Sequence, residues 1–442
     1  MTKTPGAPVT GNAGPEPPVP RPARRKLVPA GRRRRVLLVA LVLFAALLIP
    51  VGISLGSALN DPANGSSIGA RAAEWFRGHG AESIVNWIEN VWYTHHQPPV
   101  GGRPPKGEIR VPKRAVAPVA PVALGPSHLA PPVPITPLAS PALTGEGQWS
   151  PAGRLVEGVP AIYETELRPD PIHTSQVVGV AWMDATLLDA TLYSGSIIPG
   201  GGPYSHTAPI QPAAATSLVA AFNAGFLMAN ANGGYYTDGR TEIPLVNGAA
   251  SFVVYANGSA TVGEWGRDVT MTPDVVSVRQ NLDLLVDGGQ PVPGLNANDT
   301  TRWGFTLGNQ VYVWRSGVGV TADGALVYVG GPSLNITSLA NVLVAAGCVR
   351  AMELDINTDW VNMATYDPPE GQPATPNNGT NLLSTMSGGT GRYFQSYWER
   401  DFITMSSAYG VAQTLPTPTT TTVPKASTRT TDRTKTKSTA GG

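Results

Sequence analysis

Cysteine is nearly absent from this 442-residue chain, which contains one, Cys348. A single cysteine cannot form an internal disulfide, so an exported domain of this chain would depend on its core for stability. We interpret Cys348 as a small buried apolar residue. Histidine is also scarce in the region that we expect to be globular. His173 and His206 have no partner there at metal-ligand spacing, which disfavours a zinc site.

Motifs of the common catalytic classes are missing as well. Residues 52–56 match G-x-S-x-G, but they lie in a long apolar run where no nucleophile elbow can form. The glycine-rich segment 195–209 precedes no strand-to-helix junction, and we interpret it as an ordinary loop rather than a phosphate-binding one. We find no internal repeat. Carboxylate, amide and arginine chemistry therefore remains for a functional site.

Charge is unevenly distributed along the chain. The net charge is +1, with +8 in residues 1–35 and +4 in residues 413–442, so the region between them carries −11. An acidic domain is a poor candidate for nucleic-acid binding, and no nucleic-acid partner is expected.

The most specific physical signal is the run VLLVALVLFAALLIPVGISLG at residues 36–56, which carries no charge. Its 21 residues are long enough to span a bilayer as a helix, and RRRR at residues 32–35 should remain in the cytoplasm. The sequence thus predicts a single-pass membrane anchor with a cytoplasmic N-terminus and an extracellular main domain. A cleaved signal peptide is the alternative.

The remaining sequence divides by composition into four zones. Residues 67–95 have aromatic and aliphatic residues at helical spacing, which predicts juxtamembrane amphipathic helices. Residues 97–142 resemble an extended Pro-rich linker, and residues 146–412 form the expected globular domain. Residues 413–442 form a Thr/Pro/Lys-rich tail that we expect to be disordered.

Within the globular part, strand signals predominate. Residues 251–265 alternate around Asn257 and Gly258 as in a β-hairpin, and residues 301–331 predict three strands with turns at 308–309 and 323–324. A helix is expected to start at Thr337 or Ser338 and to stop at Gly347, followed by a strand over residues 349–356. We therefore expect an α/β (α+β) fold with a mixed, largely antiparallel sheet and packed helices.

Three motifs follow one another in this region: FNAGF at residues 222–226, RSGVGVTADG at 315–324 and AMELD at 351–355. In order and spacing they resemble the N-G-G-F, R-T-A-I-G-x-x-x-D-G and A-x-x-L-D segments of the phosphodiester glycosidase family. This family includes an enzyme that removes N-acetylglucosamine from a phosphodiester. The resemblance covers about residues 215–365, and the layout is similar to that of membrane-anchored members from high-GC Gram-positive bacteria.

The resemblance implies roles that the residue chemistry can support. Arg315 would bind phosphate because a guanidinium can fork two oxygens. Asp355 and Glu353 would act as base and acid, and Asn223 would bind sugar or phosphate. Gly225 would let the backbone approach the ligand. No cofactor is predicted, although a divalent cation held by Glu353, Asp355 and Asn357 is a possible addition.

Structural roles for the same residues are the alternatives. Arg315 would then pair with a surface acid, Asn223 would cap a turn, and Asp355 with Asn357 would close a strand through bonds to the backbone. The family resemblance favours the functional roles for Arg315, Asn223 and Asp355.

The chain departs from the family after Asp355, where INTDW at residues 356–360 replaces a Gly-rich turn. Either the substrate differs, with Trp360 stacking on a sugar, or the site no longer turns over. The sequence thus indicates a membrane-anchored glycosidase that hydrolyses sugar-1-phosphodiesters in cell-envelope or extracellular glycans. A non-catalytic glycan-binding or envelope scaffold protein is the alternative, and a hydrolase of wall glycopolymers is a weaker third hypothesis.

Overall fold

The computed structural model of the protein describes residues 39, 48–60, 68–81, 85, 98–112, 127–296, 298–299, 302–304, 311–395 and 400–409. The chain divides into two units, Met1–Ser57 and Ala58–Gly442. In the first unit, residues 48–57 are helical, and the helix continues to residue 60. Most of the expected span 36–56 lies outside the described residues. In the part of the chain that is described, no helix combines the length and the apolarity needed to cross a membrane.

The second unit begins with one of the predicted amphipathic helices. Helix α2 spans Ile68–Gly78, and the ring of Trp75 stacks on that of His79 with 4.1 Å between centroids. The second predicted helix lies outside the described residues except at positions 81 and 85, and the tail 413–442 lies wholly outside them.

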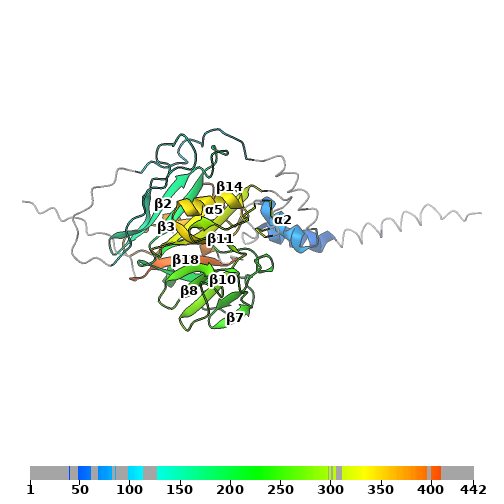
Figure 1. Ribbon diagram of the computed structural model, residues 1–442. Helices are drawn as coiled ribbons and strands as arrows, with labels where there is room; N and C mark the ends of the chain where they lie inside the picture. The colour runs from blue at the N-terminus through cyan, green and yellow to red at the C-terminus, as the bar shows by residue number, and fades with distance from the viewer. Residues whose placement is uncertain are drawn as a thin grey trace, which may run out of the picture. The chain divides into compact units, whose positions relative to one another are not determined.

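Three antiparallel sheets form the body of this unit (Figure 1). We name each after one strand. The β13 sheet has the order β1 (Ser150–Val156), β2 (Val159–Leu167), β3 (Val178–Met183), β14 (Leu326–Leu334), β13 (Val313–Thr321), β15 (Cys348–Glu353), β11 (Leu284–Asp287) and β12 (Gln290–Pro291). The β5 sheet has the order β17 (Gly379–Asn381), β16 (Met363–Tyr366), β5 (Leu218–Asn223), β18 (Phe402–Ser407) and β4 (Leu188–Tyr193). The β8 sheet has the order β7 (Arg240–Ile243), β6 (Tyr235–Thr237), β10 (Val275–Gln280), β8 (Ala250–Tyr255) and β9 (Ala260–Glu264).

Helices are few in the described part of this unit. Besides α2 and the helical residues 58–60 and 85, these are α4 (Pro212–Ala215), α5 (Ile336–Ala345) and three 3-10 turns, η2 (Met228–Asn230), η4 (Pro376–Asn378) and η5 (Arg392–Phe394). The observed fold therefore contains fewer helices than the expected α/β class, because antiparallel strands joined by short turns need no helical crossovers. The expectation of a largely antiparallel sheet is confirmed.

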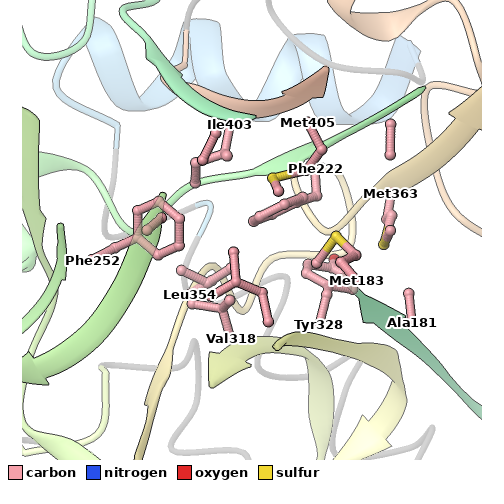
Figure 2. Close-up of a cluster of buried hydrophobic side chains, with 14 of the residues drawn as sticks. Ala181, Met183, Phe222, Phe252, Val318, Tyr328, Leu354, Met363, Ile403 and Met405 are labelled. Atoms are coloured by element: carbon pink, nitrogen blue, oxygen red, sulfur yellow. The ribbon is translucent and has the colours of Figure 1, made fainter. Parts of the chain in front are cut away.

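The main core lies where the inner faces of the sheets meet (Figure 2). Val318 and Tyr328 of the β13 sheet face Phe222 and Met405 of the β5 sheet, and Phe252 joins them from the β8 sheet. All five side chains are essentially excluded from solvent. Because alternate strand residues point to opposite faces, the intervening residues of β13 face helix α5 instead.

Helix α5 covers that second face of the β13 sheet, and the glycines of RSGVG explain its close approach. A Cβ added at Gly317 would lie 3.2 Å from Leu343 and 3.0 Å from the carbonyl of Met352. At Gly319 it would lie 2.6 Å from the sulfur of Cys348. These glycines let the helix and β15 pack directly on the β13 backbone. Cys348 is buried here, as expected, and burial raises the pKa of its thiol.

The helix itself starts at Ile336, one or two residues before the predicted start at Thr337 or Ser338. Asn335 is the N-cap and accepts a hydrogen bond from the Ser338 amide, while the Ser338 hydroxyl accepts one from the Asn335 amide. Gly347 follows the helix with φ of +92°, so the predicted glycine stop is confirmed. Strand β15 then leads directly to Asp355.

The described parts of the expected linker 97–142 pack on the sheets rather than extending away from them. Arg110 forms ion pairs with Glu164 and Glu166 of β2, whose side chains are only 1% and 3% exposed. Ile135 is 4% exposed and belongs to the core beneath α5. Glu146 pairs with Arg168 at 2.8 Å. The packed body therefore includes residues well before position 146.

Candidate functional site

Strand ends from the β13 and β5 sheets converge on Asp355. Asn223 is the last residue of β5, Asp355 follows β15, and Asp401 directly precedes β18. All three side chains are buried. Because β5 pairs with β18 in antiparallel fashion, the end of one strand lies beside the start of the other, as the Phe402–Asn223 register shows.

Asn223 links these strand ends through side-chain hydrogen bonds. Its Nδ2 donates to the Ser316 hydroxyl at 3.0 Å, and that hydroxyl donates to the Asp355 carbonyl at 2.9 Å. Its Oδ1 accepts from the Tyr328 hydroxyl at 2.8 Å and from the Asn362 amide at 3.1 Å. The expected ligand-binding amide thus makes its hydrogen bonds to protein groups, which tie the β5 sheet to the β13 sheet.

The Asp355 carboxylate faces an arginine that sequence reasoning did not select. Its Oδ1 accepts from the Asn357 amide at 2.9 Å, and its Oδ2 lies 3.7 Å from Nη1 of Arg400. Burial raises the pKa of Asp355, and the positive charge of Arg400 acts in the opposite direction. Nη1 of Arg400 is buried and makes no hydrogen bond to a described residue. This nitrogen has donor capacity for a ligand.

Trp360 lies beneath Arg400 rather than facing open solvent. The guanidinium carbon lies 4.4 Å from the centroid of the Trp360 ring, and the tryptophan is 2% exposed. The turn that carries it is held by Asn357, whose carbonyl accepts from the Trp360 amide at 2.9 Å. In place of the Gly-rich turn that the family resemblance leads us to expect, this chain thus places a cation–π support for an arginine.

Arg279 and Asp401 form a second buried ion pair, with 2.6 Å between Nε and Oδ2. Gly225 lies against this group: a Cβ there would be 3.1 Å from Cζ of Arg279 and 2.7 Å from Oδ1 of Asn281. The close backbone approach expected at Gly225 is therefore made to protein side chains. It allows Asn281 to accept from the Phe226 amide and to donate to the Glu353 carbonyl, each at 3.0 Å.

Arg315 pairs with Glu353 rather than with Asp355. Arg315 donates to Glu353 and to backbone carbonyls that include those of Leu334 and Trp303. Burial, with a further contribution from the negative charge of Asp355, raises the pKa of Glu353 to about 7, and the pairing with Arg315 acts in the opposite direction. The expected neighbours Glu353 and Asp355 thus have different cationic partners, because Asp355 lies beyond the strand end. Among the described residues, no cluster of three His, Cys, Asp or Glu side chains could hold a metal ion.

Arg279, Arg400 and Asp401 are the members of the site that sequence reasoning missed. They come from β10 and from the segment before β18, far from AMELD in the sequence. The one local signal is an adjacent Arg–Asp pair immediately before the apolar strand Phe402–Ser407. Chemically, the arrangement places one carboxylate beside one arginine with a free donor, which suits a substrate that carries an anionic group next to an electrophilic carbon.

Residues 216–355 match the model of a family described as phosphodiester glycosidase. The resemblance carried by FNAGF, RSGVGVTADG and AMELD is therefore confirmed for this segment. The match ends at Asp355, so Trp360 and Arg400 lie outside it. No curated protein matches the chain.

Two solved structures are similar to parts of the chain. One is the catalytic domain of zebrafish N-acetylglucosamine-1-phosphodiester alpha-N-acetylglucosaminidase, auto-inhibited by its pro-peptide. It has 14% sequence identity and a TM-score of 0.36, and the similarity covers 58% of this chain and 87% of that one. The other is a hypothetical protein from Synechocystis, with 14% identity, a TM-score of 0.30 and coverage of 56% and 62%. The family match, rather than these structures, is the basis for assigning a chemistry.

Proposed function

We propose that this protein is a phosphodiester glycosidase that hydrolyses sugar-1-phosphodiester bonds in cell-envelope or extracellular glycans. The observation that carries the proposal is the Asp355–Arg400 contact at 3.7 Å, at the end of the segment that matches the family. This contact supports the proposal because it brings a carboxylate and a cation side by side.

The chemistry needs few protein groups. The bond between the anomeric carbon and the phosphate oxygen breaks, the phosphate keeps the electron pair, and a water oxygen bonds to the carbon. Asp355 stabilises the oxocarbenium-like centre or accepts the water proton. Arg400 binds the phosphate, whose negative charge grows as it leaves, through charge-assisted hydrogen bonds. A phosphate monoester, with a second pKa of about 6, leaves without prior protonation.

The other site residues act as supports in this proposal. Trp360 and Asn357 hold Arg400 and Asp355 in place, and Asn223 fixes the strand ends. The buried Arg315–Glu353 pair links β13 to β15 and keeps the end of β15 in position. A fixed constellation of this kind reduces the reorganisation required in the transition state.

The test uses the full chain and aryl esters of glucose-, mannose- and N-acetylglucosamine-1-phosphate in water enriched in ¹⁸O. We expect free sugar with the label on its anomeric hydroxyl, because the carbon–oxygen bond breaks. Label in the phosphate would show cleavage at phosphorus and would contradict the proposed reaction. Asp323→Asn is the matched control for substitution of Asp355 and should release sugar at the parental rate, because Asp323 is an exposed acid in the β13–β14 turn.

A non-catalytic glycan-binding protein is the second candidate, and the glycine-free turn Ile356–Trp360 favours it. Asp355 is 4% exposed behind this turn, so the carboxylate is closed off from solvent. Binding of the same esters without release of sugar would support this candidate and contradict the enzyme.

We further propose that the protein is exported and anchored by residues 36–56, with residues 1–35 in the cytoplasm and 146–412 containing the functional domain. The apolar run and its basic flank support this arrangement. Protease added to intact cells should remove the domain and leave an N-terminal fragment. An intact chain in cells whose other surface proteins are digested would contradict it.

A further inference from the structure

A cavity of about 570 Å³ opens at the same end of the β13 sheet as Asp355. Trp314 of β13, Gln176 before β3 and Asn381 of β17 line three of its sides. Pro105, Gly107, Glu108 and Arg110, which precede the domain predicted from the sequence, also line it. The cavity is therefore composed of segments that lie far apart in the chain.

The cavity and the Asp355 site share their supporting strands. Trp314 is two positions before Ser316 on β13, so both side chains lie on the same face of the sheet. Ser316 is the residue that binds the Asp355 carbonyl. In the β5 sheet, the amide of Leu382, which follows the cavity residue Asn381, donates to the Met363 carbonyl at 3.0 Å. Met363 follows Asn362, whose backbone amide donates to Oδ1 of Asn223. Hydrogen bonds of Ser316 and Asn362 thus connect the strands that line the cavity to the strand ends around Asp355.

The charges at the cavity disfavour a second phosphate. Its charged lining residues are Glu108, Arg110 and Glu166. The guanidinium of Arg110 is already engaged by Glu164 and Glu166. Carboxylates therefore outnumber the cation, and a neutral ligand fits this balance better than an anion does.

The remaining lining is suited to hydroxyl groups and to a sugar ring. Trp314 supplies an aromatic surface, and Gln176, Ser384 and Thr385 supply polar groups. Oδ1 of Asn381 is buried and accepts no hydrogen bond from a described residue, so it would have to be uncovered before a sugar hydroxyl in the cavity could donate to it.

We propose that this cavity binds a neutral sugar unit of the glycan whose phosphodiester lies at Asp355. This inference rests on the proposed function, and it makes residues 105–110 part of the substrate site. The protein would then select glycans longer than the single sugar-1-phosphate unit.

The test measures binding to the full chain separately from hydrolysis. The probes are the neutral trisaccharides chitotriose, mannotriose and maltotriose, followed by saturation-transfer NMR. We expect at least one of them to bind. Ser384→Trp, which fills the cavity from an exposed position, and Trp314→Leu should each weaken that binding tenfold or more. Tyr409→Ala, which removes an exposed aromatic side chain outside the cavity, is the control and should not change it.

Two outcomes overturn the inference: none of the three trisaccharides binds, or one binds equally well to Ser384→Trp. A melting temperature for each variant shows whether it folds, and the exposed Ser384 site keeps the test informative if Trp314→Leu unfolds. Trisaccharide binding without hydrolysis of any phosphodiester would refute the proposed function and leave the cavity assignment intact. Hydrolysis without such binding would refute the cavity assignment alone.

Discussion

Arg315 and Glu353 form an ion pair between β13 and β15, with 2.5 Å between Nη1 and Oε1 and side chains that are 2% and 0% exposed. Removing one partner leaves the other charge buried, which costs about 3–5 kcal/mol. We expect Arg315→Met to lower the free energy of unfolding by about this amount in denaturant titrations at a pH above 7, where Glu353 in the parent is ionised.

The control for this prediction is Arg302→Met. Arg302 pairs with Asp283 at 2.8 Å, but both side chains are more than 40% exposed. Exposed pairs contribute about 0–1 kcal/mol, so this variant should be nearly as stable as the parent. Equal effects of the two substitutions would contradict a structural role for the buried pair.

Asp355→Asn keeps the size and most hydrogen bonds of the side chain but removes its charge. We expect the rate of sugar release to fall by about 10²–10⁴-fold, in the range typical of a lost general base. The measurement is steady-state hydrolysis of the aryl phosphosugars. Asp323→Asn should retain the parental rate, and an active Asp355→Asn enzyme would place the chemistry elsewhere.

Arg400→Gln removes the proposed phosphate ligand while keeping a polar side chain over Trp360. We expect kcat/KM for the phosphodiester to fall by about 10²–10³-fold. Arg400→Lys should recover part of the activity, because a lysine keeps the charge without the planar fork. Arg240→Gln is the matched control, since Arg240 stacks on Tyr204 at 5.2 Å and is 44% exposed. A rate unaffected by Arg400→Gln would exclude it as the phosphate ligand.

Stability should fall as pH rises between about 4.5 and 7. Burial raises the pKa of Glu353 to about 7, whereas an unfolded glutamate titrates near 4.5. In this window the native protein keeps a proton that the unfolded chain has lost, so raising the pH favours unfolding, by up to about 1.4 kcal/mol per pH unit for one proton. Burial acts in the same direction on Glu164 and Asp355.

Glu353→Gln isolates the contribution of one carboxyl to this slope. The variant should show a flatter dependence of unfolding free energy on pH between 4.5 and 7, measured by denaturant titration at several pH values. Asp323→Asn serves as the control. An unchanged slope in Glu353→Gln would show that Glu353 is ionised throughout this range.

The segment that packs before position 146 should contribute to stability. A chain that begins at residue 143 loses the buried Ile135 and the Ala139 and Pro141 carbonyls, which accept hydrogen bonds from Arg168. We expect it to be less stable than a chain that begins at residue 98 by about 2 kcal/mol or more. Equal melting temperatures of the two chains would show that residues 98–142 do not stabilise the folded protein.

Local sequence signals predicted local structure well. The alternation in residues 251–265 produced the paired strands β8 and β9, and the turn at 323–324 joins β13 to β14. The turn predicted at 308–309 lies outside the described residues. The observed helix starts earlier than the predicted one because Asn335, rather than Thr337 or Ser338, provides the N-cap.

The partners of Asp355 could not be predicted in this way. Glu353 and Asp355 are two positions apart, but the chain leaves the strand between them, so strand periodicity does not apply to the second carboxylate. Arg400 reaches Asp355 only because β18 pairs with β5, and nothing near AMELD encodes that pairing. Such tertiary contacts require the sheet order, which a single sequence does not reveal.

The hydrogen bonds and ion pairs around Asp355 also set when the site forms during folding. Tyr328 and Asn223 are 105 residues apart in the chain, and Arg279 and Asp401 are 122 apart. Contacts of such long range form slowly, because the chain loses much loop entropy before they are made. The β8–β9 hairpin should therefore acquire hydrogen-exchange protection early in refolding, and the amides of residues 355–362 only in the last phase.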